Sequence, residues 1–282
     1  IFCPARVASY ENQRESVSVV LEDGTQLTAP LLVAADGAAS PLRRQSGLRQ
    51  DIWEYNQQGV VCVITTDPPN TGIAWQRFMQ GGPLAFLPLA DGRSSIVWTR
   101  PHEDARRLLA MPDDEFLTEL SEAAAGGIGT PVAAGPRAGF PLAMRLSESY
   151  CSGRVVLLGD AAHVVHPLAG QGVNLGLADA AALVEVLMQA RRSGQEEELP
   201  ATLARWQRWR RSESQLMAGG THAIRALFTP PSLSGIRAFG LRQVGKSWLA
   251  RDFFIRRAAG LGINAPRLAR GDSLKELLRT GA

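Results

Sequence analysis

The chain has 282 residues, which is enough for one large or two ordinary domains with a sizeable core. Hydrophobic residues make up 45% and charged residues 20%, as in ordinary globular proteins, and no apolar run reaches the roughly 20 residues of a membrane-spanning helix. No signal peptide is recognisable, and the three widely spaced cysteines favour a reducing compartment over a disulfide framework.

Charge is distributed unevenly along the chain. The first 200 residues carry 15 Lys/Arg and 23 Asp/Glu, a net of −8, whereas the segment from Ala201 onward carries 15 and 4, a net of +11. A basic tail on an acidic body indicates an anionic partner, such as a membrane, a nucleic acid or an acidic protein. A solvated helical face is the simpler alternative.

The first 30 residues have the pattern of a β-hairpin. Residues 17–21 alternate like a strand, the turn signal Glu22-Asp23-Gly24-Thr25 follows, and a second strand begins after it. Because a protein rarely begins inside a hairpin, we expect the sequence to be a fragment that lacks an N-terminal part.

Two short apolar runs each end in an acidic residue. Residues 31–35 lead into Asp36-Gly37, and residues 154–158 lead into Gly159-Asp160, as expected of buried parallel strands with polar loops at their carboxyl ends. Ligands of open α/β sheets bind outside these strand ends, where an Asp can accept hydrogen bonds from a sugar or polyol. Ser40, followed by proline, predicts a helix start.

The remaining elements follow from turn and helix signals. A β-rich middle is predicted at 60–66, 82–89 and 94–99, with a hairpin turn at Asp91-Gly92, and helices are predicted at 113–125 and 172–192. Beyond Pro200 the chain is predicted to be mostly helical, with breaks at 229–231, at 260–262 and at Pro266.

The loop after Asp160 suits a flat, electron-rich ligand. Gly170 and Gly172 remove side chains, so that backbone N–H groups can approach a ring or an anion, and the helix that follows directs its positive end to the same place. Reduced flavin gathers negative charge at its pyrimidine edge. A polyol for Asp160 and a ring for the glycine loop match the ribityl chain and isoalloxazine of FAD.

A metal site and a catalytic base are the alternatives at this loop. Asp160, His163 and His166 have the spacing of three ligands on two helical turns, but Pro167 and Gly170 interrupt the helix and no further Cys or Glu completes a site. His163 is expected to be a packed histidine at a turn. Either histidine is a possible base by residue type, and no Ser-His-Asp or Cys-His set is apparent.

The longer strings resemble a known family. Residues 153–187, GRVVLLGDAAHVVHPLAGQGVNLGLADAAALVEVL, resemble the Gly-Asp segment of class A flavoprotein monooxygenases, and LLVAADGAASPLRRQSG resembles their Asp-Gly motif. Within that class, HPLAGQGVNLG and GPLAFLPLADGRSSIVWT are similar to the ubiquinone-biosynthesis (2-polyprenylphenol) hydroxylases. The resemblance implies an α/β fold: an incomplete, p-hydroxybenzoate hydroxylase-like FAD/NAD(P)-binding fold with a β-sheet substrate domain and a helical C-terminus.

The resemblance also implies roles for individual residues. FAD would be bound by Asp36, Gly37, Gly159, Asp160, Pro167, Gly170, Gln171, Gly172, Val173 and Asn174, with Arg43 assisting NAD(P)H. Pro167 and His166 would lie at the reacting edge of the flavin, and Leu84, Phe86 and Pro88 would line the substrate pocket, although a role in the sheet core is the open alternative. The implied reaction is hydroxylation of a polyprenyl phenol by O₂ through a flavin C4a-hydroperoxide.

The chain departs from the family in one respect. The G-x-G-x-x-G fingerprint after an opening strand is absent, and so is the acidic residue that follows it. We therefore expect 1–50 to be a remnant of the FAD domain, 51–140 the β-rich substrate domain, 141–192 the Gly-Asp segment and 193–282 a basic helical region. A truncated, non-catalytic scaffold of a quinone-biosynthesis complex is the alternative function.

A lipid-like substrate gives the basic tail a role. Aromatic and basic residues interleave there: Phe228, Trp248, Phe253 and Phe254 with Arg237, Arg242, Lys246, Arg251, Arg256 and Arg257. This pattern favours a cytoplasmic protein peripheral to the inner face of the membrane. A quinone-biosynthesis complex or a homo-oligomer is the alternative partner, and nucleic acid is not expected because no recognition motif accompanies the charge.

Overall fold

The computed structural model describes residues 1–166, 170–195, 198–228, 234–262 and 264–279. The chain divides into two compact units. Unit 1 consists of residues 1–53, 144–222 and 242–282, and unit 2 consists of residues 54–143 and 223–241. Each unit is described by itself.

Unit 1 contains a small sheet with two buried parallel strands. Strand β12 (Val155–Leu157) pairs in parallel with β4 (Leu32–Ala34), and β11 (Cys151–Ser152) pairs antiparallel with β12 on the other side. The three residues of β12 are fully buried. The prediction of two buried parallel strands is confirmed, and their carboxyl ends place the Asp36 and Gly159-Asp160 loops at the same sheet edge.

The helix after β4 begins as predicted. Pro41 opens α1 (Pro41–Gln45), and the Ser40 hydroxyl accepts a hydrogen bond from the backbone N–H of Arg43 at 2.9 Å. At the start of the chain, β1 (Val7–Asn12), β2 (Val17–Leu21) and β3 (Gln26–Ala29) form an antiparallel meander with its own apolar cluster. The predicted hairpin is therefore confirmed.

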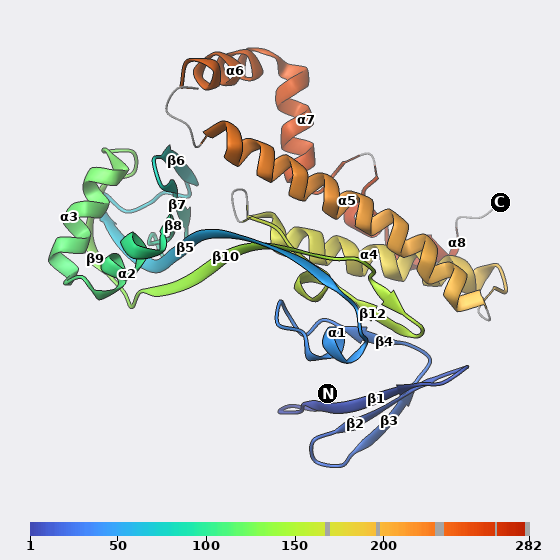
Figure 1. The fold of residues 1–282 in the computed structure, drawn as a ribbon. Coiled ribbons are helices and arrows are strands. Elements are labelled where there is room, and N and C mark those ends of the chain that lie inside the picture. Colours follow the sequence, from blue (N-terminus) through green and yellow to red (C-terminus); the bar gives the residue numbers. More distant parts are fainter. Residues whose placement is uncertain (167–169, 196–197, 229–233, 263, 280–282) are drawn as a thin grey trace. The chain divides into compact units, whose positions relative to one another are not determined.

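Two long helices cover the small sheet. Helix α4 (Gln171–Arg192) and the first part of α5 (Leu199–Phe228) run side by side (Figure 1), and the Trp206 indole of α5 donates to the Asp179 carbonyl of α4 at 3.1 Å. Leu183, Leu203 and Trp206 complete the core against β12. The predicted helix at 172–192 is confirmed.

Helix α4 corrects one expectation. Among the described residues, its length and composition alone would suit a membrane crossing, contrary to the expectation that the chain holds no such segment. Its carboxylates Asp179 and Glu185 are nevertheless buried, and both are hydrogen-bonded. α4 therefore packs as a core helix of unit 1.

Unit 2 is an antiparallel sheet with helices on one face. The strands follow the order β10, β5, β8, β7 and β6, and β9 also pairs with β5. Their bounds are β5 Gln50–Asp67, β6 Trp75–Met79, β7 Gly82–Pro88, β8 Ser94–Pro101, β9 Thr130–Ala134 and β10 Ala138–Ser147. β7 and β8 form the predicted hairpin around Asp91-Gly92.

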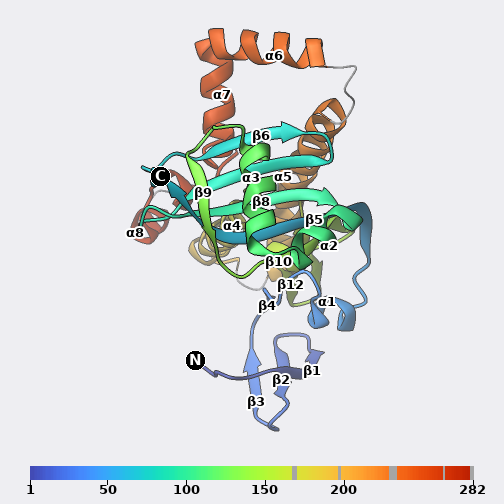
Figure 2. The same cartoon turned by 90° about the vertical axis from the view of Figure 1, so that its left-hand side faces the viewer.

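Helices α2 (His102–Ala110) and α3 (Asp113–Ala124) cover that sheet, and Figure 2 shows α3 lying across the strands. Leu108, Phe116 and Leu120 pack with the inward side chains of β5, β7 and β8. The core of unit 2 therefore lies between the helices and one face of the sheet. Helix α3 matches the prediction for 113–125.

The C-terminal part is helical, as predicted. Its elements are α6 (Ser234–Lys246), α7 (Trp248–Ala258), the short 3₁₀ helix η5 (Leu268–Arg270) and α8 (Leu274–Arg279). The break predicted at 260–262 follows the end of α7. The break predicted at 229–231 lies outside the described residues.

Candidate functional site

The Asp36 loop is built around the start of α1. The exposed Asp36 carboxylate accepts a hydrogen bond from the Leu42 backbone N–H at 3.1 Å, and Gly37 has φ +82°, a left-handed conformation that glycine adopts without strain. Asp36 and Ser40 thus each satisfy one of the open N–H groups of α1. One carboxylate oxygen of Asp36 has this role, and the side chain still faces solvent.

Arg43 links the two strand-end loops. Its buried guanidinium donates to the carbonyl of Ala161 at 2.8 Å and to the carbonyl of Ala38 at 3.0 Å. Burial lowers the pKa of Arg43 below its ordinary value, although the group stays charged at neutral pH. The expected contact of Arg43 with NAD(P)H stays a prediction, and in the structure the residue joins the Asp36 loop to the Gly159 loop.

The turn after β12 packs closely on α4. Gly159 has φ +60°, and a Cβ built on Gly176 would lie 3.2 Å from the Gly159 Cα. A side chain at Gly176 would crowd the turn, and a side chain at Gly159 would strain its left-handed backbone. The neighbouring residue Asp160 is exposed on a short 3₁₀ helix, η1 (Gly159–Ala161), as a ligand-binding carboxylate requires.

A buried carboxylate that the sequence did not reveal holds this turn. Asp179 of α4 accepts hydrogen bonds from the Arg210 Nε at 2.7 Å, from the His163 Nε2 at 2.6 Å and from the Gly159 N–H at 3.2 Å. The side chains of Asp179, Arg210 and His163 are all buried. Removing one partner of such a buried ion pair costs about 3–5 kcal/mol in proteins.

The two histidines have different surroundings. His163 lies on β13 (His163–Val164) and directs Nε2 to Asp179, so the expectation of a packed histidine at a turn is confirmed. His166 is also buried, and its role as a catalytic residue stays a prediction. Pro167 lies outside the described residues. The described residues contain no group of three His, Cys, Asp or Glu side chains arranged to hold a metal.

The cysteines do not supply a nucleophile in this part of the chain. Burial raises the pKa of Cys62 to about 11 and the pKa of Cys151 to about 12, which keeps both as thiols at neutral pH. All three cysteines are free thiols.

The glycine loop forms the N-terminus of α4. Gly170 is its N-cap in the left-handed conformation (φ +61°), and within the described part of the chain no side chain caps this helix end. Gln171 is buried, whereas Val173 and Asn174 are exposed. The backbone N–H groups of a first helical turn have no acceptor within the helix itself, and they point out of the N-terminus of α4.

Gly172 identifies the side from which an acceptor can approach. A Cβ built on Gly172 meets no atom within 4 Å, and its φ lies outside the left-handed region. Among the residues that the structure describes, neither packing nor backbone conformation requires glycine here, although glycine in a helix is less stable than alanine. The bare backbone at Gly172 is therefore suited to a ligand that must come close.

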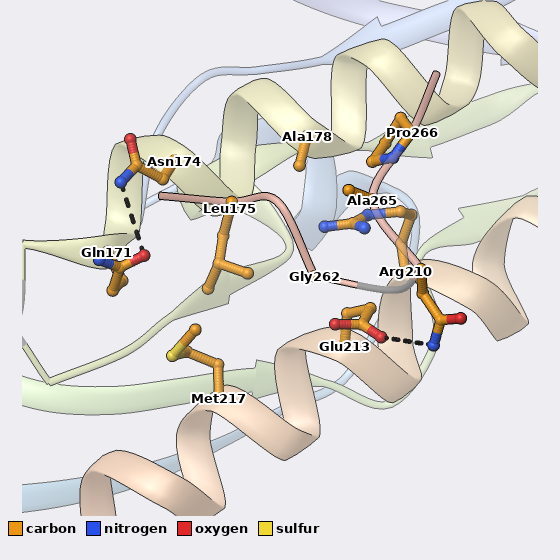
Figure 3. Close-up of a pocket in the computed structure, with 12 residues that line it drawn as sticks. Gln171, Asn174, Leu175, Ala178, Arg210, Glu213, Met217, Gly262, Ala265 and Pro266 are labelled. Atoms are coloured by element: carbon orange, nitrogen blue, oxygen red, sulfur yellow. Dashed lines mark hydrogen bonds between the residues drawn. The ribbon is translucent and has the colours of Figure 1, made fainter. Parts of the chain in front are cut away.

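A pocket lies beside the same turn of α4. Figure 3 shows Gln171 and Leu175 of α4 and Arg210 and Met217 of α5 around it, with Gly262, Ala265 and Pro266 on another side. The Asn264 amide donates to Glu213 at 3.0 Å and holds this side of the pocket on α5. Sequence patterns gave no sign of this pocket, because its walls come from three distant segments.

The proposed substrate residues of unit 2 need correction. Leu84 and Phe86 are fully buried in the core between the sheet and helices α2 and α3, so neither has surface available to a substrate. Their alternation places Ala85 and Leu87 on the opposite face of β7. Pro88 is partly exposed, and its role stays a prediction.

Comparison with known proteins identifies the family. A model of the FAD binding domain family matches residues 1–210. The chain belongs to this family. It is 36% identical to a ubiquinone hydroxylase, UbiL, of Rhodospirillum rubrum over 96% of this chain and 64% of that protein. It is 32% identical to the 3-demethoxyubiquinol 3-hydroxylase of Escherichia coli over 92% of this chain and 66% of that protein.

Solved structures agree with this assignment. The Pseudomonas aeruginosa protein PqsL, in complex with 2-aminobenzoylacetate, aligns with a TM-score of 0.69 at 29% identity, over 83% of this chain and 66% of that chain. The expected α/β flavoprotein monooxygenase fold is thus confirmed. The chain spans slightly less than two thirds of the length of both named hydroxylases.

The residues of unit 1 fit an FAD. The exposed Asp160 suits a polyol hydroxyl, the uncapped N-terminus of α4 suits the pyrimidine edge, and Gly172 leaves room for a ring. The structure places Gly159, Asp160, Gly170, Gln171, Gly172, Val173 and Asn174 in the two segments that Asp179 and Gly176 hold together. Their individual contacts with FAD stay predictions.

The variant Gly172→Ala distinguishes an effect on protein stability from an effect on FAD binding. We expect the variant to be more stable by up to ~1 kcal/mol, because alanine favours the helix. We expect its FAD dissociation constant to rise about tenfold, because the methyl group occupies the ligand side. Thermal unfolding without FAD and a fluorescence titration with FAD measure the two effects.

Gly219→Ala is the matched control for this variant. Gly219 lies in α5, and its added Cβ also meets nothing within 4 Å. It should stabilise the protein similarly and leave the FAD dissociation constant unchanged. Equal FAD affinity in both variants would show that the glycine loop is not a flavin cradle.

Proposed function

We propose that this chain is part of an FAD-dependent NAD(P)H monooxygenase that hydroxylates the aromatic ring of a polyprenyl phenol in ubiquinone biosynthesis. The observation that carries the proposal is the glycine-lined N-terminus of α4 in a chain that matches a ubiquinone hydroxylase and a 3-demethoxyubiquinol 3-hydroxylase over more than 90% of its own length. The alternative of a non-catalytic scaffold is not favoured, because the exposed Asp160 and the glycines at the start of α4 are present.

Asp160 and the start of α4 would hold FAD, which when bound would supply the redox chemistry that links NAD(P)H, O₂ and the aromatic ring. The residues of this chain bind, orient and stabilise. Asp160 accepts hydrogen bonds from the ribityl hydroxyls, and the N–H groups at the start of α4 stabilise negative charge at the pyrimidine edge. Because these donors are fixed before the reaction, little reorganisation is needed when charge develops.

The sheet face of unit 2 that lies away from α2 and α3 suits the substrate. Val61, Val63 and Val97 are half-buried on the face away from α2 and α3, and Leu87 is 44% exposed there. Cross-strand pairs join Val61 to Val97 and Val97 to Ala85 across β5, β8 and β7. An apolar face of this kind binds a prenylated ring by burial of hydrocarbon, which gives affinity without polar specificity.

Attachment to the inner face of the cytoplasmic membrane is part of the proposal. In α7, Trp248 and Leu249 are well exposed, and so is Ile255 (67%, 64% and 59%). Arg242, Lys246, Arg251 and Arg256 are exposed in the same stretch, where the one acidic residue, Asp252, pairs with Arg256 at 2.8 Å. Exposed apolar side chains among cations match the surface of an anionic bilayer.

Flavin binding and turnover test the activity. We expect the purified protein to take up added FAD, to give the visible absorption bands of a bound flavin and to oxidise NAD(P)H faster when a prenylated phenol is supplied. Hydroxylated product identified by mass spectrometry would complete the result. A protein that ignores FAD would leave the family membership standing and would overturn the assignment of catalysis to this chain.

Leu87→Gln tests the substrate face. We expect the apparent KM for a prenylated phenol to rise about tenfold, because an apolar contact with the substrate is lost. The FAD dissociation constant should not change. Val132→Gln, at an exposed position of β9, is the control that should leave KM unaltered. An unchanged KM in Leu87→Gln would remove this face from the substrate site.

Vesicle flotation tests the membrane surface. We expect the protein to float with phosphatidylglycerol vesicles but not with phosphatidylcholine vesicles, and binding should weaken as salt screens the charges. Trp248→Ser/Leu249→Ser should lower binding about tenfold. Leu274→Ser/Leu278→Ser, on exposed positions of α8, should bind like the wild type. Equal loss in both double variants would contradict a surface on α7.

A further inference from the structure

Asp179 occupies an unusual position for a carboxylate. Its side chain has no exposed surface, so no cofactor or substrate touches it directly. Both oxygens are engaged: Oδ1 accepts from the Arg210 Nε, and Oδ2 accepts from the Gly159 N–H and the His163 Nε2. Three segments, namely the turn after β12, helix α4 and helix α5, therefore meet at one buried carboxylate.

The donors on Oδ2 hold the turn at two points. Gly159 opens the turn and His163 follows it, so the exposed Asp160 lies between two residues that share a single acceptor atom. Asp179 itself lies about two turns along α4 from Gly172 and Val173. Because α4 is continuous between them, fixing Asp179 to the turn also fixes the N-terminus of α4 relative to Asp160.

We infer that Asp179 is the positioning residue of the flavin site, on the basis of the proposed function. It fixes the turn that carries Asp160 relative to the N-terminus of α4, the two segments that would hold the polyol and the ring of one ligand. Arg210 of α5 places a positive charge beside Asp179, at 2.7 Å from Oδ1.

The protonation of His163 follows from the same contacts. Asp179 can only accept, so the proton lies on Nε2, and among the described residues Nδ1 has no hydrogen-bond partner. Asp179 is therefore the hydrogen-bond partner that orients the His163 ring among the described residues, and the Tyr150 ring packs beside it with centroids 5.7 Å apart. Asparagine at position 179 has one acceptor oxygen and one donor amide group. It therefore cannot accept hydrogen bonds from Arg210, Gly159 and His163 as the two carboxylate oxygens do.

The test compares Asp179→Asn with Glu185→Gln. Glu185 is a second buried carboxylate of α4, and its Oε2 accepts from the Arg267 N–H at 2.8 Å, away from the turn. Three quantities are measured well below the unfolding temperature: the FAD dissociation constant, the absorption spectrum of the bound flavin and the nuclear magnetic resonance signal of the His163 ring N–H.

Asp179→Asn should raise the FAD dissociation constant about tenfold to a hundredfold, as removal of an outer-shell partner does at other bound groups. It should also change the flavin spectrum and abolish the strongly hydrogen-bonded His163 signal. Glu185→Gln should lower the unfolding temperature and keep the FAD affinity and the His163 signal. If Asp179→Asn does not fold, Arg210→Lys is used, and a smaller rise in the dissociation constant is expected.

The outcomes separate this inference from the proposed function. A variant at Asp179 that is less stable but binds FAD with wild-type affinity and spectrum would assign Asp179 a purely structural role and overturn the inference alone. An unchanged His163 signal would overturn it as well. Wild-type protein that binds no FAD would overturn the proposed function and the inference with it.

Discussion

The buried carboxylate of Asp179 is the constraint on which unit 1 depends. A charge taken out of water must be paired and fully hydrogen-bonded, or it costs several kcal/mol. Arg210 supplies the opposite charge from α5, and Gly159 and His163 supply the other donors from the turn after β12. The strand end and the two helices cannot separate without leaving a buried charge unpaired.

The other contacts of the site follow from this arrangement. Gly159 and Gly176 allow the turn to lie directly on α4, and Arg43 ties the Ala161 carbonyl to the Asp36 loop. The buried polar side chains Asp179, Arg210, His163 and Arg43 thus hydrogen-bond within the fold, while Asp160 and the N-terminus of α4 lie at the surface. Unit 1 therefore has polar groups at its surface with which it can bind a ligand, as well as a stable core.

The sequence predicted the parts of this arrangement that depend on local chemistry. The hairpin turns, the Ser40 cap, the two buried strands and the start of α4 each rest on residues a few positions apart. Asp179 and Arg210 could not be predicted, because 31 positions separate them and each lies in an ordinary helical pattern. That Leu84 and Phe86 of β7 face the helices could not be predicted, since the position of α2 and α3 is a tertiary property.

The glycines of the site show how requirements of the fold and of a ligand can be told apart. Gly159 has a positive φ and the Gly176 backbone against it, so the chain itself explains why no side chain is present. Gly172 has neither, and it lies in the first turn of a helix that alanine would favour. An open helical glycine alone does not identify a ligand site, because Gly219 of α5 is equally open. Gly172 also lies in the first turn of α4, where the backbone N–H groups favour a partner that is electron-rich where it touches the helix. The flavin pyrimidine edge satisfies this condition, whereas an apolar ligand would not.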